Sequence, residues 1–259
     1  FNLAFMGDMI FEKPLGKSKS KKSIIPYVNN LSFKDYENSI KGKSLNFGGD
    51  VKLAVDNSLT LDLTLNPDFS QVEVDQQVTN LTRYEVTLPE KRQFFIENSD
   101  LFSSFGNSKD ANPFFSRRIG IGRDINGNSI ENKIDFGVRL SGKLNNNFRI
   151  GLLNMQTQED IQNEIAATNN SIVALQHKVF NRSNINFIFI NKQSTKNYDF
   201  SENGKDYNRL IGLDYNLASK DNKWNGKYYI HKSFTEEHKN KDISLGLNTS
   251  FNTKNISFR

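Results

Sequence analysis

Cysteine is absent from this 259-residue sequence. Disulfide bridges and thiolate metal sites are therefore excluded, and cysteine usage gives no information about the redox state of the compartment. Long apolar runs are also missing, since the longest have only four residues, as at positions 172–175 and 187–190. A helix needs about 20 apolar residues to span a bilayer, so transmembrane helices are excluded. Transmembrane strands are not excluded, because such strands are short and only half apolar.

Apolar residues are scarce overall. They make up 36% of the chain, and the mean hydropathy is −0.61. A soluble α/β domain of this length would carry a larger core. A β-barrel with a water-filled lumen needs less, because only its outward face must be apolar. The composition therefore favours a barrel over a compact α/β domain.

The charge balance is mild. There are 34 Lys and Arg against 29 Asp and Glu, a net charge of +5. This excess is too diffuse to predict nucleic acid as a partner. The lysine-rich run at residues 17–22 could bind lipid headgroups or nucleic acid, but charge runs of this kind are usually solvated loops. We expect the second.

Most of the chain alternates apolar and polar residues. Ile134, Phe136, Val138 and Leu140 fall on one face of a predicted strand, and the same pattern returns in residues 59–65, 148–152, 213–217 and 243–247. Asn- and Lys-rich turns separate these segments, as at residues 145–147 and 238–241. Residues 23–30 and 44–56 also read as strands, with Gly48 and Gly49 marking a bulge or a close backbone approach. The sequence predicts an antiparallel meander of hairpins.

One stretch, residues 59–118, breaks this regularity. Four sequence blocks lie in or next to this stretch. They are GGDVK at 48–52, LDLTLNPDFSQVE at 61–73, PEKRQFFIE at 89–97 and PFFSRRIG at 113–120. Four blocks in one order are more specific than a single short motif. On these residues the chain resembles a family of Gram-negative outer-membrane β-barrel proteins. In that family the barrel usually follows an N-terminal domain similar to family-9 carbohydrate-binding modules.

The resemblance implies a fold and a location more firmly than an activity. We expect an all-β fold, an antiparallel transmembrane β-barrel of meander topology with an inserted non-strand segment. Residues 1–259 are expected to form part of one such barrel domain. About ten to twelve strand segments are visible, and a whole barrel would hold more. No signal peptide is visible at Phe1, so we also expect the natural N-terminus to lie upstream of this sequence.

Residues 89–115 are the predicted insert. Pro89 and Pro113 argue against a central strand at its edges, and Phe side chains interleaved with charge suit neither lipid nor a free loop. We predict that this segment is a loop or folds into the lumen as a constriction, held by ion pairs of its basic residues. The candidate site residues are Glu90, Lys91, Arg92, Phe94, Phe95, Glu97, Asp100, Phe114, Phe115, Arg117 and Arg118.

Catalytic and metal-binding alternatives rest on carboxylates. Six of them gather in the central block: Asp68, Glu73, Asp75, Glu90, Glu97 and Asp100. Two could serve a glycoside hydrolase, and the alternating pair Glu73 and Asp75 could bind Ca²⁺ with Asp68. Mixed charges in one block favour mutual neutralisation instead. His177, His231 and His238 have no metal-ligand spacing and are expected to be structural.

The sequence therefore predicts a non-catalytic protein of the cell outer membrane, with no cofactor and no metal. Its expected role is binding or passage of a solute, with a glycan as a candidate ligand and membrane lipid as the surrounding partner. One alternative is a structural subunit that contacts other outer-membrane proteins. The other is a secreted carbohydrate-active enzyme built on a soluble β-sandwich.

Overall fold

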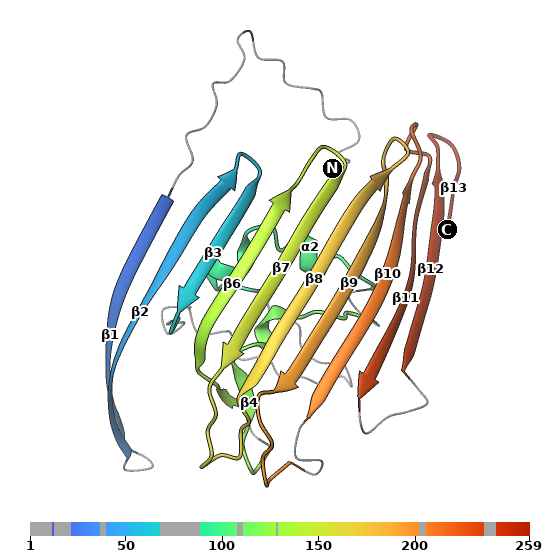
Figure 1. The fold of residues 1–259 in the computed structure, drawn as a ribbon. Helices are drawn as coiled ribbons and strands as arrows, with labels where there is room; N and C mark the ends of the chain where they lie inside the picture. The colour runs from blue at the N-terminus through green and yellow to red at the C-terminus, as the bar shows by residue number, and fades with distance from the viewer. Residues whose placement is uncertain are drawn as a thin grey trace.

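The computed structural model describes residues 12, 22–36, 40–67, 89–107, 111–127, 129–201, 206–235 and 242–259. Eleven of its strands form one sheet in which nearly every neighbour in space is also the next strand in the chain (Figure 1). All pairings in this sheet are antiparallel. The prediction of an all-β antiparallel meander is confirmed.

The eleven strands of the large sheet are β1 (Lys22–Asp35), β2 (Ile40–Asp56), β3 (Leu59–Leu65), β6 (Ile134–Lys143), β7 (Phe148–Thr157), β8 (Thr168–Val179), β9 (Ser183–Ser194), β10 (Tyr207–Ala218), β11 (Trp224–Thr235), β12 (Ile243–Asn252) and β13 (Ser257–Phe258). Between β3 and β6 the chain leaves the sheet. It forms α1 (Gln93–Ile96), α2 (Asp100–Ser103), η2 (Ser116–Arg118) and a small hairpin of β4 (Ile121–Arg123) and β5 (Ser129–Glu131).

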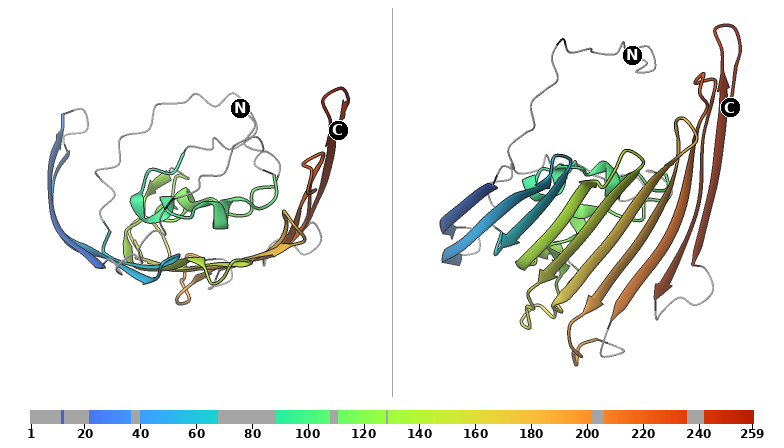
Figure 2. Two further views of the ribbon diagram at one scale, coloured as in Figure 1. Left: turned by 90° about the horizontal axis from the view of Figure 1, so that it is seen from above. Right: turned by 45° about the horizontal axis from the view of Figure 1, so that its top comes forward.

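The sheet is curved into an open trough. Seen from above, the strands follow an arc, and the short helices between β3 and β6 lie inside it (Figure 2). We call the described part of this segment, residues 89–107, 111–127 and 129–133, the insert. The insert lies on the concave face, over the middle strands. The described strands leave the sheet open, and closure into a barrel stays a prediction.

The two faces of the sheet differ in chemistry. Alternation along the strands sends polar residues such as Asp62, Arg139 and Asp214 to the concave face, where they are 8%, 1% and 0% exposed. Apolar residues such as Leu213 and Leu245 point to the convex face and are 49% and 69% exposed. The convex face is thus apolar and open, and the concave face is polar and covered.

Ile134 is a correction to the predicted strand pattern. It was expected on the same face as Phe136, Val138 and Leu140. A register shift between Ile134 and Phe136 turns it over instead, and Ile134 is buried in the concave-face core at 3% exposure. A bulge adds one residue on one strand, which reverses the side-chain alternation beyond it.

The N-terminal half has three further outcomes. The tight approach predicted at the glycine pair is confirmed, because a β-carbon on Gly48 would lie 2.5 Å from the Asn66 carbonyl oxygen. Pairing through Gly48 and Gly49 is regular, without a bulge. Most of the lysine-rich run at residues 17–22 lies outside the described residues.

Candidate functional site

Apolar packing holds the insert on the sheet. Six apolar insert side chains are between 2% and 8% exposed: Phe95, Leu101, Phe102, Phe105, Phe114 and Ile119. They share one cluster with concave-face residues of β7, β8 and β9, namely Leu153, Met155, Ile172, Ala174 and Ile188. Gly151 makes room for the ring of Phe102, since a β-carbon there would lie 2.7 Å from it. This cluster is the main apolar core of the described structure.

Glu90 and Arg92 form an ion pair at the start of the insert, next to η2. Arg92 Nη2 lies 2.8 Å from Glu90 Oε2, and Arg92 Nε donates to Glu90 Oε1 at 2.8 Å. Arg92 also donates to the carbonyl oxygens of Ser116 and Ile119 at 2.7 and 2.6 Å. Burial alone would raise the pKa of Glu90, but the bonds and charge of Arg92 and a bond from Ser116 outweigh burial and lower this pKa.

Glu90→Gln is expected to flatten the acid dependence of stability. Because the folded-state pKa of Glu90 is lowered, its stabilisation is complete above the unfolded-state pKa near 4.5 and is lost as pH falls through the folded-state pKa. At neutral pH the variant should lose about 1–3 kcal/mol, since a neutral amide replaces the carboxylate that Arg92 binds. Urea unfolding at several pH values measures this, with the exposed Glu131→Gln as control. A difference that stays constant from neutral to acid pH would contradict the assignment.

Arg139 of β6 is the central anchor between insert and sheet. It is 1% exposed, and its Nη2 and Nε lie 2.7 and 3.2 Å from Asp62 Oδ2 on β3. Its Nη1 donates to the carbonyl oxygen of Glu97 in the insert at 2.8 Å. Its guanidinium lies 5.2 Å from the ring centre of Phe94. Lys52 of β2 adds an ion pair to the Glu97 carboxylate.

A second set of anchors holds α2 and the residues that follow it on the sheet. Arg149 of β7 pairs with Asp100 of α2 at 2.7 Å. On β10, Asp214 is fully buried and accepts a bond from the Gly106 backbone N–H at 2.7 Å, while His231 Nε2 lies 2.7 Å from its other oxygen. Lys227 donates to the carbonyl oxygen of Ser104. The insert is thus tied to strands from β2 to β11.

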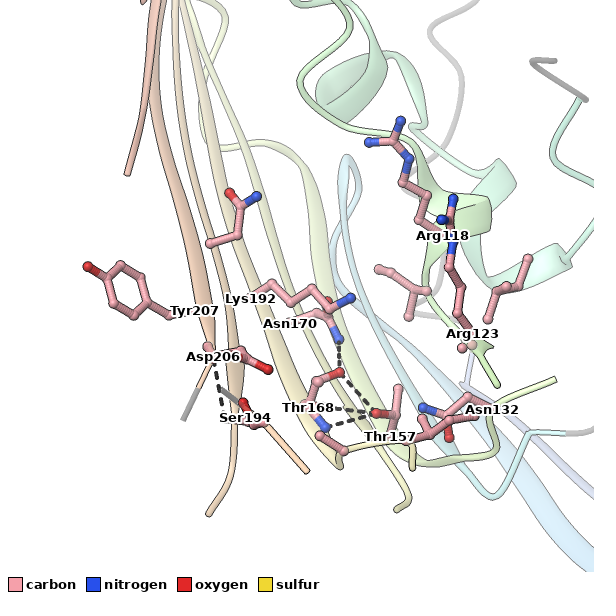
Figure 3. A pocket seen from close by; sticks show the side chains of 18 of the residues that line it. Arg118, Arg123, Asn132, Thr157, Thr168, Asn170, Lys192, Ser194, Asp206 and Tyr207 are labelled. Atoms are coloured by element: carbon pink, nitrogen blue, oxygen red, sulfur yellow. Dashed lines mark hydrogen bonds between the residues drawn. The ribbon is translucent and has the colours of Figure 1, made fainter. Parts of the chain in front are cut away.

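A cavity of about 870 Å³ opens beside the insert at one end of the trough. One wall is the insert, from η2 to β4, and the other is formed by the ends of β7, β8, β9 and β10 (Figure 3). Arg118 and Arg123 stand on the insert wall, and Lys192 and Asn170 on the sheet wall. Four cationic residues line the cavity against two carboxylates, Glu164 and Asp206, so its lining is basic.

One family model matches most of the chain. The model of the family described as "Domain of unknown function (DUF5916)" matches residues 20–259. The chain belongs to this family. No curated protein matches the chain. The DUF5916 match spans the sheet and the insert together, so both are parts of the family's domain.

In this DUF5916 domain the predicted site residues belong to the insert, which lies on the concave face of the sheet (Figure 2). We expected Lys91, Arg92, Arg117 and Arg118 to tie the insert to the wall. Among the bonds described, Arg92 holds Glu90, and Arg117 donates to the Pro89 carbonyl oxygen at 2.9 Å, both within the insert. Two of the described ion pairs to the sheet come from insert carboxylates, Glu97 and Asp100.

The Phe residues divide between core and cavity. Phe95 and Phe114 are buried in the core cluster, and Phe94 packs against it. Phe115 is half-buried and lines the cavity. Lys91 is also half-buried, and its backbone N–H donates to Glu90 Oε1 at 3.1 Å.

The candidate residues chosen from the sequence did not include the anchors on the sheet, Asp62, Arg139, Arg149 and Asp214. The available signal was opposite charge at paired positions, because Asp62 and Arg139 are directly opposite on β3 and β6. Cross-strand pairs of opposite charge are a known stabilising arrangement. Once the strand register is known, this pair can be read from the sequence.

Some of the residues considered for metal binding are described by the structure, and others are not. Among the described residues, no group of three His, Asp or Glu side chains could hold a metal ion. Asp68, Glu73 and Asp75, the residues considered for Ca²⁺, lie outside the described residues, as does His238. His231 has a structural partner in Asp214. Within the described chain, no helix combines the length and apolar character needed to cross a bilayer.

Proposed function

We propose that this DUF5916 domain is part of a transmembrane β-barrel in a Gram-negative outer membrane. In this proposal it binds or passes a solute, with a glycan as a candidate, and catalyses no reaction. The observation that carries the proposal is the distribution of apolar and charged side chains over the two faces of the sheet. Its open convex face is apolar, and its concave face carries buried charge and the insert.

The convex face supports a lipid surround. Large apolar side chains are exposed along it on strands from β1 to β12, including Ile24, Val28, Phe47, Leu65, Val138, Ile211, Leu213, Ile230, Leu245 and Leu247. A monomeric soluble protein rarely exposes so wide an apolar surface. A soluble β-sandwich would cover it with a second sheet, and the described residues form one large sheet and one small hairpin.

The two ends of the strands support interfaces with headgroups. At one end aromatic rings meet on the convex face, with Trp224 and Phe251 4.8 Å apart and Tyr215 and Tyr228 6.0 Å apart. At the other end polar side chains bond to each other, as between Asn154 and Ser171 at 2.8 Å. Strands β7 to β11 have 10 to 12 residues, close to the roughly 9–11 that a tilted strand needs to cross a bilayer.

Arginine substitutions at two depths of β10 test the proposal. Leu213 and Leu217 lie on the same convex face, and Leu217 is one residue from the end of the strand. In a bilayer Leu213→Arg should cost about 2–4 kcal/mol of folding free energy and Leu217→Arg only about 0–1, because the penalty falls towards the interface. Urea unfolding of protein folded into lipid vesicles measures both. In a water-exposed sheet both changes should stay within about 0.5 kcal/mol, and that result would overturn the membrane assignment.

A further inference from the structure

We propose that the cavity between the insert and the ends of β7 to β10 binds a small acidic sugar, that is, a sugar-sized polyol with one phosphate or carboxylate. This inference rests on the proposed solute-binding function and names the class of solute. The volume of about 870 Å³ lies within the range of roughly 300–1,000 Å³ seen for small-molecule sites.

Cations from two walls meet across this cavity. Arg118 and Arg123 come from the insert, and Lys192 comes from β9 (Figure 3). Asp206 also lines the cavity beside these cations. An anionic group placed between the walls would pair with cations on both sides. The anion would also bridge the insert and the sheet.

A floor of hydroxyl and amide side chains lies beside these cations. Thr157 is 2% exposed, and its Oγ1 lies 3.0 Å from Thr168 Oγ1. Asn170, 8% exposed, donates to Thr168 Oγ1 at 3.3 Å. Ser194, 3% exposed, completes the floor on β9. These bonds fix the side chains in place, so their remaining donors and acceptors are preorganised for ligand hydroxyls.

The apolar part of the lining suits the ring of a sugar. Phe115 of the insert and Phe200 of the connection between β9 and β10 both line the cavity. An aromatic face covers the C–H groups of a sugar ring, while the hydroxyl groups at the ring's edge reach the polar floor. An inorganic anion would use the cations alone. The combined lining therefore favours an acidic sugar over phosphate or a neutral sugar.

Calorimetric titration of the purified protein in detergent tests this proposal. The probes are glucose 6-phosphate and glucuronate, with glucose and inorganic phosphate as comparisons. At least one acidic sugar should bind more tightly than either comparison. Lys192→Gln and Arg123→Gln should each weaken its binding about tenfold, which corresponds to one lost charged hydrogen bond.

Lys178→Gln is the matched control. Lys178 is exposed on the same concave face, at the opposite end of β8 from Thr168, and does not line the cavity. Its substitution should leave the affinity unchanged. The proposal is overturned if neither acidic sugar binds, if glucose or phosphate binds as tightly, or if Lys178→Gln has the same effect as Lys192→Gln. The Leu213 and Leu217 comparison remains an independent test of the membrane assignment, so the two failures can be told apart.

Discussion

Replacing residues 93–112 with a short Gly/Ser linker is expected to raise single-channel conductance several-fold in planar bilayers. The deletion removes α1, α2 and the buried side chains of Phe95, Leu101, Phe102 and Phe105, which fill space on the concave face. It keeps Glu90, Arg92 and Ser116, which bond to one another and bring the cut ends together. If the trough is half of a lumen, emptying it widens the path for ions.

The folding of the deletion variant is checked first, and its conductance is compared with that of two single substitutions. Heat-modifiable mobility on a gel shows whether the variant has assembled into the proposed barrel. Gln93→Ala changes an exposed insert side chain and should leave conductance unchanged. Asp100→Asn removes the charge that pairs with Arg149, and it should give an intermediate, fluctuating conductance because one anchor is weakened. Unchanged conductance in a folded deletion variant would place the insert outside the conducting path.

Arg139→Ala is expected to destabilise the protein by about 3–5 kcal/mol. Arg139 is 1% exposed, and its loss leaves the Asp62 carboxylate, itself 8% exposed, without its closest charged partner. Breaking a buried pair at one end costs this much because the remaining charge stays desolvated. Lys52, 3.9 Å from Asp62, compensates weakly because its side chain is 44% exposed. The urea midpoint in detergent micelles measures the loss.

A double variant separates the buried charge from the lost packing. Asp62→Leu combined with Arg139→Met removes both charges and keeps apolar volume, so it should recover most of the stability lost in Arg139→Ala. The bond from Arg139 to the Glu97 carbonyl oxygen is also lost in the double variant, so recovery should be incomplete. If the double variant is as unstable as the sum of the two single variants, the pair does not act as a unit.

The sequence by itself determined the sheet. Alternation of apolar and polar residues, as in Leu61, Asp62, Leu63 and Thr64, sets which side chains share a face, because successive residues of a strand point to opposite sides. Polar turns such as residues 145–147 set where each hairpin reverses. Prolines and Phe pairs marked residues 89–115 as different. These are local properties, and local spacing is enough to read them.

Only the tertiary structure decided how the two faces are used. The bulge before Phe136 turns Ile134 into the core. Leu59 is buried at 8% exposure although it was expected on the same face as Leu61, and it pairs with Asp56 next to a register shift in β2. The partners of the insert also came from the tertiary structure. Glu97 bonds Lys52, and Gly106 bonds Asp214, 108 residues away. Such partners depend on strand register and on the curvature of the sheet, which bring distant residues together, and sequence spacing contains neither.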